Sequence, residues 1–184
     1  MDLTDYSLCS KLKIRQAGLE KLRWMTSQNT RKALVDGMFH SVLTYCLPLF
    51  GGCAQSELDS LQVLQNRAAR FVLNCPPRFH REDMFDKLGW LTVRQLIAYL
   101  SLVLVQRVKE SNEPEFLAAC FRRVNHNGHI LVHNTPLELY RSSFVYRTSI
   151  LWNKFPRSLR EEKREKSFKK NVKCWIINTC ERFK

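Results

Sequence analysis

The chain has 184 residues, 45% hydrophobic and 26% charged, a composition that allows a buried core in one domain or two small ones and argues against wholesale disorder. Lysine and arginine number 30 against 17 acidic residues, which gives a formal net charge of +13 and a pI of about 9.7. An excess of this size indicates a polyanionic partner, either nucleic acid or an anionic membrane surface. Residues 141–184 carry 13 basic and 4 acidic residues, so the last quarter of the chain holds most of the net charge.

The apolar spacing in the first half of the chain predicts three helices separated by glycines and prolines. The first is expected over about residues 8–25 and the second over about 30–45. Four side chains are expected to form the buried stripe of the second helix: Leu34, Met38, Val42 and Tyr45. The third is expected to open with a capping box at Ser56 and to end at the proline pair 76–77. Its predicted buried face is Leu58, Leu61, Leu64, Ala68 and Phe71.

The second half is also predicted to be helical. The most apolar helix, over about 93–109, is apolar on nearly every side and is therefore expected at the centre of the core. Its longest apolar run is only about half of a membrane span, so it is expected to be a buried helix. Other helices are expected over four segments: 81–88, 115–123, 142–153 and from about 167 onward. Residues 124–139, rich in Asn and His, are expected to form a loop or linker. The prediction is an all-α chain, an irregular bundle of about seven or eight helices, divided into a domain over 1–123, this linker, and a basic C-terminal helical element over 140–184.

Metal-dependent and hydrolytic chemistry have little support in the sequence. The seven cysteines are scattered, odd in number and preceded by no signal peptide, which favours reduced thiols in an intracellular protein. His126, His129 and His133 lie near Cys120, but no paired Cys-x-x-Cys accompanies them as in structural zinc sites. Gly-x-Ser-x-Gly, a Walker loop and His-Glu-x-x-His are all absent from the sequence. No catalytic residue, metal or cofactor is therefore predicted for this chain.

Four signatures occur in order between about residues 20 and 176. The first, KLRWMTSQNTRKALVDGMFHSVLTYCLPLFGGC, is a helix with a basic residue and a terminal Tyr that runs into a Pro-apolar-aromatic-Gly turn: Arg31, Tyr45, Pro48, Phe50, Gly51 and Gly52. The second is the helix LQVLQNRAARFVLN, with Gln62, Gln65, Asn66, Arg67, Ala68 and Arg70. The third is LGWLTVRQLIAYLSLVLVQRV, with Gly89, Trp90, Leu91 and Tyr99. The fourth joins SFVYRTSILWNKFPRSLR to SFKKNVKCWI, with Ser143, Phe144, Arg147, Trp152, Asn153, Pro156, Arg160, Phe168, Lys169 and Trp175.

Together these signatures resemble the region that follows the palm in LINE-type (non-LTR) retrotransposon reverse transcriptases of the jockey-like kind. Phe50 departs from the family, which usually has Trp there. The resemblance implies that residues 1–123 form a thumb-like domain and that the parent enzyme is an RNA-directed DNA polymerase that uses Mg²⁺. The sequence contains no Asp-Asp pair of the palm, so the chain is expected to be a non-catalytic C-terminal fragment. The implied partners are RNA, an RNA–DNA hybrid or DNA, together with the parent's palm and fingers, in a ribonucleoprotein of nucleus and cytoplasm.

Basic side chains on helix faces are the predicted nucleic-acid contacts, since phosphate contacts give affinity independent of base sequence. The candidates are Arg67, Arg70, Arg147, Arg157, Arg160, Lys166, Lys169, Lys170 and Lys173. The alternative for each is a solvated helix face. Trp90, Trp152 and Trp175 are expected to pack in the core rather than to stack on bases. A folded structural or protein-interaction remnant without nucleic-acid binding is the competing function, and membrane binding is disfavoured because the last helix has only a narrow apolar face.

Overall fold

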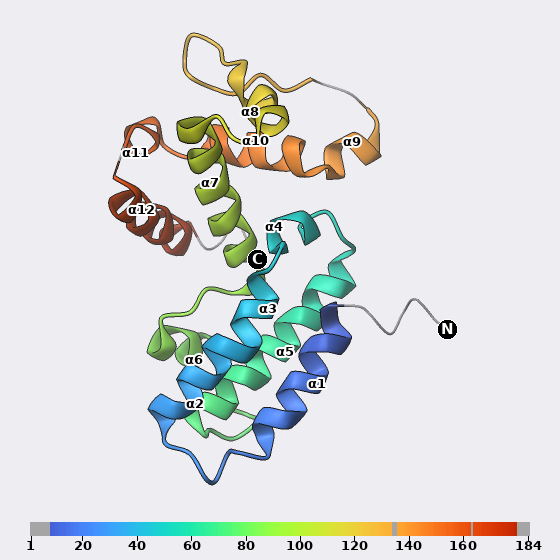
Figure 1. Cartoon of the computed structure of the whole chain (residues 1–184), viewed down its shortest axis with the longest axis vertical. Coiled ribbons are helices and arrows are strands. Elements are labelled where there is room, and N and C mark those ends of the chain that lie inside the picture. The colour runs from blue at the N-terminus through green and yellow to red at the C-terminus, as the bar shows by residue number, and fades with distance from the viewer. Residues whose placement is uncertain (1–7, 134–135, 163, 180–184) are drawn as a thin grey trace. The chain divides into compact units, whose positions relative to one another are not determined.

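A computed structural model describes residues 8–133, 136–162 and 164–179, and over these residues the chain is all-α, which confirms the predicted fold class (Figure 1). Within that range the only pairing of extended backbone is an isolated antiparallel bridge between Val124 and Ile130. The chain forms two compact units, composed as follows: residues 8–47 with 54–93, and residues 48–53 with 94–179. The division between the units therefore does not coincide with the linker expected at 124–139.

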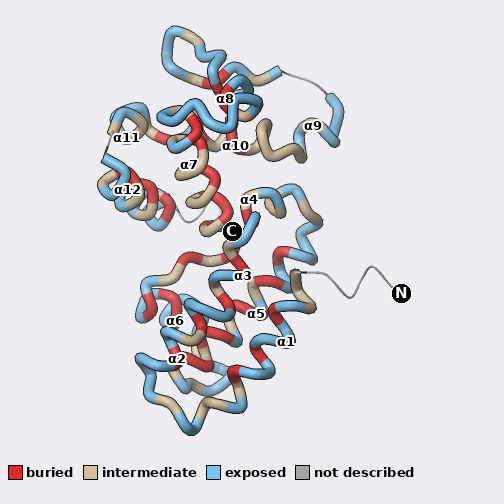
Figure 2. Tube along the Cα trace, viewed as in Figure 1, coloured by how far each residue is buried: buried red, intermediate tan, exposed pale blue. Residues whose placement is uncertain are grey.

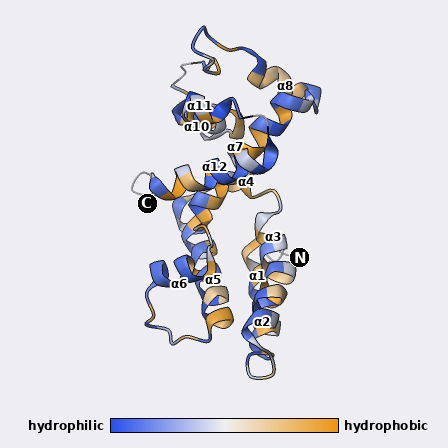
Figure 3. Ribbon diagram, turned by 90° about the vertical axis from the view of Figure 1, so that its left-hand side faces the viewer, coloured by the Kyte–Doolittle hydropathy of each residue, from blue (hydrophilic) through white to orange (hydrophobic). Residues whose placement is uncertain are grey.

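The first unit is built around α5 (Gln55–Leu73), the helix that contacts most of the others. The surrounding helices are α1 (Leu8–Glu20), α2 (Gln28–Val35), η2 (Asp36–His40), α3 (Ser41–Thr44) and α6 (Arg81–Leu88). The predicted face of α5 is confirmed as buried, and its buried residues recur along the helix in Figure 2. Figure 3 shows hydrophobic and hydrophilic residues along the same helix, as expected for a helix with one apolar side.

The buried stripe predicted for the second helix is wrong by one position. Tyr45 is 76% exposed and Met38 is 41% exposed, whereas the buried residues are Arg31, Val35, Phe39, Leu43 and Leu47. They recur every four residues because η2 is a π-helical turn, which is wider than an α-helical turn and shifts the phase of the side chains. The π turn is a backbone feature that the apolar spacing alone does not reveal.

The predicted capping box at Ser56 is also wrong. The N-cap of α5 is Ala54, which makes no side-chain cap, and Ser56 lies inside the first turn. The end of α5 agrees with the prediction, because Asn74 adopts a left-handed conformation ahead of the proline pair.

His40 lies against the indole of Trp90, with ring centroids 4.2 Å apart, and its Nδ1 is 2.9 Å from Oδ1 of Asp36. Burial lowers the pKa of His40 below its ordinary value, and the smaller effect of Asp36 acts in the opposite direction. In the unfolded chain the imidazole takes up a proton more readily than in the folded one. The stabilisation from neutral His40 is therefore present above about pH 6.5 and is lost as the pH falls through and below that value.

We expect wild-type protein to lose more stability between pH 7.5 and pH 5 than a His40→Gln variant. Urea unfolding followed by circular dichroism at both pH values measures this difference. His80→Gln, at an exposed position, is the matched control and should keep the wild-type pH dependence. Equal pH dependence in the His40→Gln and wild-type proteins would contradict the expectation.

The second unit contains all of α7 (Val93–Ser111) except its first residue. The other helices of this unit are α8 (Glu115–Arg122), α9 (Glu138–Ser142), α10 (Phe144–Lys154), α11 (Arg157–Arg160) and α12 (Glu165–Asn178). Its core is aromatic. Phe155 lies 5.8 Å from Phe168 and 5.2 Å from Trp175 between ring centroids, and Trp152 packs on both phenylalanines. Trp152 is 2% exposed, so its predicted place in the core is confirmed.

The apolar helix α7 has no exposed residue from Val93 to Gln106, as expected for a central helix. By length and composition alone the segment Arg81–Ser111 contains a stretch apolar enough to cross a membrane, and half of that stretch is buried inside the protein. The core helix of a soluble protein meets the same criterion, so this is weak evidence for a span.

All of the predicted helices are present, but three short ones were not predicted: α4 (Leu47–Phe50), α9 and α11. With four or five residues each, they are too short to show a helical period. The cysteines among the described residues form no disulfide, and Cys180 lies outside those residues.

Candidate nucleic-acid interface

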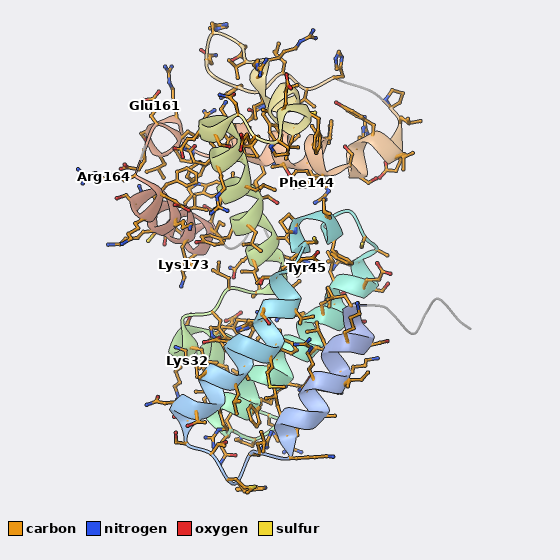
Figure 4. All side chains as sticks on the ribbon, viewed as in Figure 1. Lys32, Tyr45, Phe144, Glu161, Arg164 and Lys173 are labelled. Atoms are coloured by element: carbon orange, nitrogen blue, oxygen red, sulfur yellow. The ribbon has the colours of Figure 1, made fainter. Side chains whose placement is uncertain are left out.

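The predicted basic helix is α12, and its apolar and cationic residues lie on different sides. Phe168, Val172 and Ile176 are buried, which fixes the orientation of the helix. Lys166 and Lys170 are exposed. Lys169 and Lys173 are partly exposed, and Figure 4 shows the Lys173 side chain extending outward from α12. Spacings of three and four residues place these lysines along one side of the helix.

Glu165, at the start of α12, is the acidic residue within this cationic side. Its Oε1 lies 2.7 Å from Nζ of Lys169 and 3.0 Å from Nη2 of Arg107 on α7. Hydrogen bonds from Lys169 and Arg107 lower the pKa of Glu165, so it stays ionised. Nothing in the sequence points to Arg107, because it follows the apolar run of α7 and comes close to α12 only in the tertiary structure. One carboxylate against five cations leaves this surface strongly positive.

The two arginines of α11 are less available than the lysines. Nε of Arg157 bonds to Oε1 of Glu161 at 2.8 Å. Nη1 of Arg160 donates to the carbonyl of Gly128 at 3.1 Å, and burial lowers the pKa of Arg160. Both arginines therefore have a guanidinium that is already partly committed within the protein.

The guanidinium of Arg147 is hydrogen-bonded to main-chain carbonyls. Its Nε donates to the carbonyl of Ser142 at 2.9 Å, and its Nη2 donates to the carbonyls of Pro48 at 3.2 Å and Leu49 at 3.4 Å. Burial lowers its pKa, yet an arginine side chain stays charged in proteins. A guanidinium committed to three carbonyls holds α10 to the turn at α4, so we leave Arg147 out of the interface.

In the first unit, Arg67 is exposed and Arg70 is half-buried on α5. Nε of Arg70 is buried without a hydrogen-bond partner among the described residues. Arg67 lines a small cleft between α1 and α5 together with Lys13. Lys13 was also missed by the sequence reasoning, because nothing in the sequence pairs α1 with α5.

Trp24 is the aromatic residue that the sequence reasoning overlooked. It is 84% exposed and its neighbour Met25 is 81% exposed, in the turn between α1 and α2. Arg31 stabilises this turn, because its Nη1 donates to the carbonyls of Arg23 at 3.1 Å and Thr26 at 2.7 Å. The signal was available, since Trp24 falls outside the apolar stripe and just before the Ser27 cap of α2.

Side chains of the four signatures contact other signatures. Gln65 Nε2 donates to the carbonyl of Leu91 at 2.9 Å, and Gln62 Oε1 accepts from the backbone N–H of Val93, also at 2.9 Å, at the start of α7. These contacts join the second signature to the third, as Arg147 joins the fourth to the first. A few of the residues that carry the resemblance, Gln62, Gln65 and Arg147, thus connect segments far apart in the chain.

Asn153 of the fourth signature holds part of the segment predicted as a linker. Its Oδ1 accepts from the N–H of Ile130 at 2.8 Å and its Nδ2 donates to the carbonyl of Ile130 at 2.9 Å. Ile130 is 2% exposed, so this part of the segment is packed on the second unit and is not a free connection.

The described residues bring no three His, Cys, Asp or Glu side chains together in a group that could hold a metal ion. Comparison of the chain with protein-family models, with characterised proteins and with solved structures gives no match in any of the three. The fold and the surface define a class: an all-α protein with cationic helical surfaces in each of its two units.

Proposed function

We propose that this chain binds nucleic acid through its phosphate backbone, as a non-catalytic part of a non-LTR retrotransposon reverse transcriptase that follows the palm. The ligand is RNA or an RNA–DNA template–primer. The observation that carries the proposal is the cationic side of α12: Lys166, Lys169, Lys170 and Lys173 with Arg107 from α7. Its orientation is set by the buried Phe168, so the charge is presented to solvent by the packing of the core.

Charge of this kind favours a polyanion over a discrete small anion. The lysines recur over about two turns of helix and so extend along a line, which matches a chain of phosphates. The exposed Trp24 of the first unit adds a flat apolar surface on which a base can stack. The four sequence signatures are the support for the assignment to the reverse transcriptase family.

Replacing Lys166 and Lys170 by Ala is expected to weaken binding to a single-stranded RNA about tenfold at low salt. Each lysine that contacts a phosphate contributes about 0.7 to 0.9 to the slope of log K against log salt, so the slope should fall by about 1.5 in the double variant. Fluorescence anisotropy with labelled single-stranded RNA, an RNA–DNA hybrid and duplex DNA, across a salt series, measures both quantities.

Lys166→Arg with Lys170→Arg keeps the charge and should retain both affinity and slope. Lys154→Ala, at an exposed position on α10, is the control for loss of positive charge elsewhere in the same unit. Absence of binding at low salt by wild-type protein with a normal circular dichroism spectrum would overturn the proposal and favour a structural remnant. Binding with an unchanged slope in the Ala variant would move the contact away from α12.

A further inference from the structure

A cleft of about 190 Å³ lies within the first unit between α1 and α5. Six residues line it: Lys13, Gln16, Ala17, Glu20, Leu64 and Arg67. The four from α1 are spaced by three and four residues and the two from α5 by three, so each helix contributes one face. On the same measure one water molecule needs about 10 to 15 Å³, so the cleft has room for a group of sugar size.

Gln16 is the residue in the cleft that the packing of α1 on α5 does not explain. It is 6% exposed, and its Oε1 is buried with no hydrogen-bond partner among the described residues. Buried polar atoms are normally hydrogen-bonded, and an amide oxygen can only accept. The oxygen has almost no accessible surface, so a donor in the cleft reaches it when the Gln16 amide turns toward the cleft. A ligand that presents an O–H or N–H donor there would gain a hydrogen bond.

The charge on the cleft walls adds a second requirement. Lys13 and Arg67 are exposed, one on each helix, and neither makes an ion pair with a described residue. Glu20 also lines the cleft, but Oε2 of Glu20 is paired with Nη2 of Arg23 at 2.9 Å. Two cations on opposite walls favour an anionic oxygen group between them.

The apolar part of the lining comes from Ala17 and Leu64, which offer methyl groups to the carbon face of a ligand. The requirements are thus an anion, a hydroxyl donor close to it and a compact carbon framework. A ribose with its phosphate combines all three, whereas deoxyribose lacks the 2′-hydroxyl that a protein uses to tell RNA from DNA.

We propose that the α1–α5 cleft seats one ribose–phosphate unit of an RNA strand. The phosphate lies between Lys13 and Arg67, and the 2′-hydroxyl donates to Oε1 of Gln16 once the amide has turned toward the cleft. This inference rests on the proposed function and adds to it a preference for RNA over DNA that is independent of base sequence. It also gives the first unit a binding role separate from that of α12.

The test compares three single strands of one sequence: RNA, DNA and 2′-fluoro RNA, which keeps the sugar pucker of RNA but cannot donate a hydrogen bond. Wild-type protein is expected to bind RNA about threefold to tenfold more tightly than either of the others, the range of one net hydrogen bond. Gln16→Leu keeps the size of the side chain and should bind all three strands equally, with the wild-type affinity for DNA. Its melting temperature should equal or exceed that of wild type, because an unpaired buried oxygen has been removed.

Gln28→Leu, at an exposed position at the start of α2, is the matched control and should keep the preference for RNA. Salt-dependent binding of all three strands with equal affinity by wild type would overturn this inference and leave the proposed function intact. A preference for RNA that survives in Gln16→Leu would overturn it as well. Failure of wild type to bind any strand at low salt would remove the proposed function, and this inference with it.

Discussion

Replacing Arg31 by Met is expected to lower the free energy of unfolding by about 3 to 5 kcal/mol, at the high end for a single substitution. Arg31 is 8% exposed. Its Nε donates to the carbonyl of Val72 on α5 at 3.2 Å, and its Nη1 donates to two carbonyls of the α1–α2 turn. Met keeps the length and apolar stem of the side chain but leaves these carbonyls without their charged donor. Urea unfolding followed by circular dichroism measures the loss.

Lys32→Met is the matched control, because it makes the same kind of change at the adjacent, exposed position (Figure 4). It should alter stability by less than about 0.5 kcal/mol. Comparable losses in the two variants would contradict a structural role for Arg31. The Arg31→Met protein is also expected to show a less ordered α1–α2 turn, visible as a change in the fluorescence of Trp24.

Gly51→Ala is expected to lower the free energy of unfolding by about 2 to 3 kcal/mol through overpacking. A Cβ at this position would overlap Nη1 of Arg147 and lie 2.9 Å from Cγ2 of Ile97. The end of a free arginine could move aside, but Arg147 is tied to three main-chain carbonyls and cannot move without losing them. Thermal and urea unfolding of the variant measure the effect.

Gly18→Ala provides a control of opposite sign. Gly18 lies inside α1, and a Cβ there would meet nothing within 4 Å. The substitution should therefore stabilise the protein by about 0.5 to 1 kcal/mol, since Gly is less favourable than Ala inside a helix. A Gly51→Ala variant as stable as wild type would contradict the overpacking argument.

A double-mutant cycle measures the coupling free energy between positions 51 and 147. Once Arg147 is replaced by Ala, the Gly51→Ala substitution has space for its methyl group next to the shortened side chain. The cost of Gly51→Ala should then fall by at least about 1 kcal/mol, a coupling typical of residues in contact.

Two arginines show what the sequence does not decide. Arg31 and Arg147 carry charge in helical segments, which at the level of sequence is compatible with a solvated or phosphate-binding face. Their partners are carbonyls 41 and 99 residues away in the chain. Only the tertiary structure brings those carbonyls within reach, and no local pattern distinguishes a buried arginine from an exposed one.

The sequence by itself determined the longer helical segments, the buried face of α5 and the aromatic core position of Trp152, because helix formation and burial follow a local period of apolar residues. It also located the basic side of α12. The tertiary structure decided which cations remain available, how the chain divides into two units, and that Lys13, Gln16 and Arg67 meet in one cleft. These features depend on which helices pack together, and that is set by contacts between residues far apart in the chain.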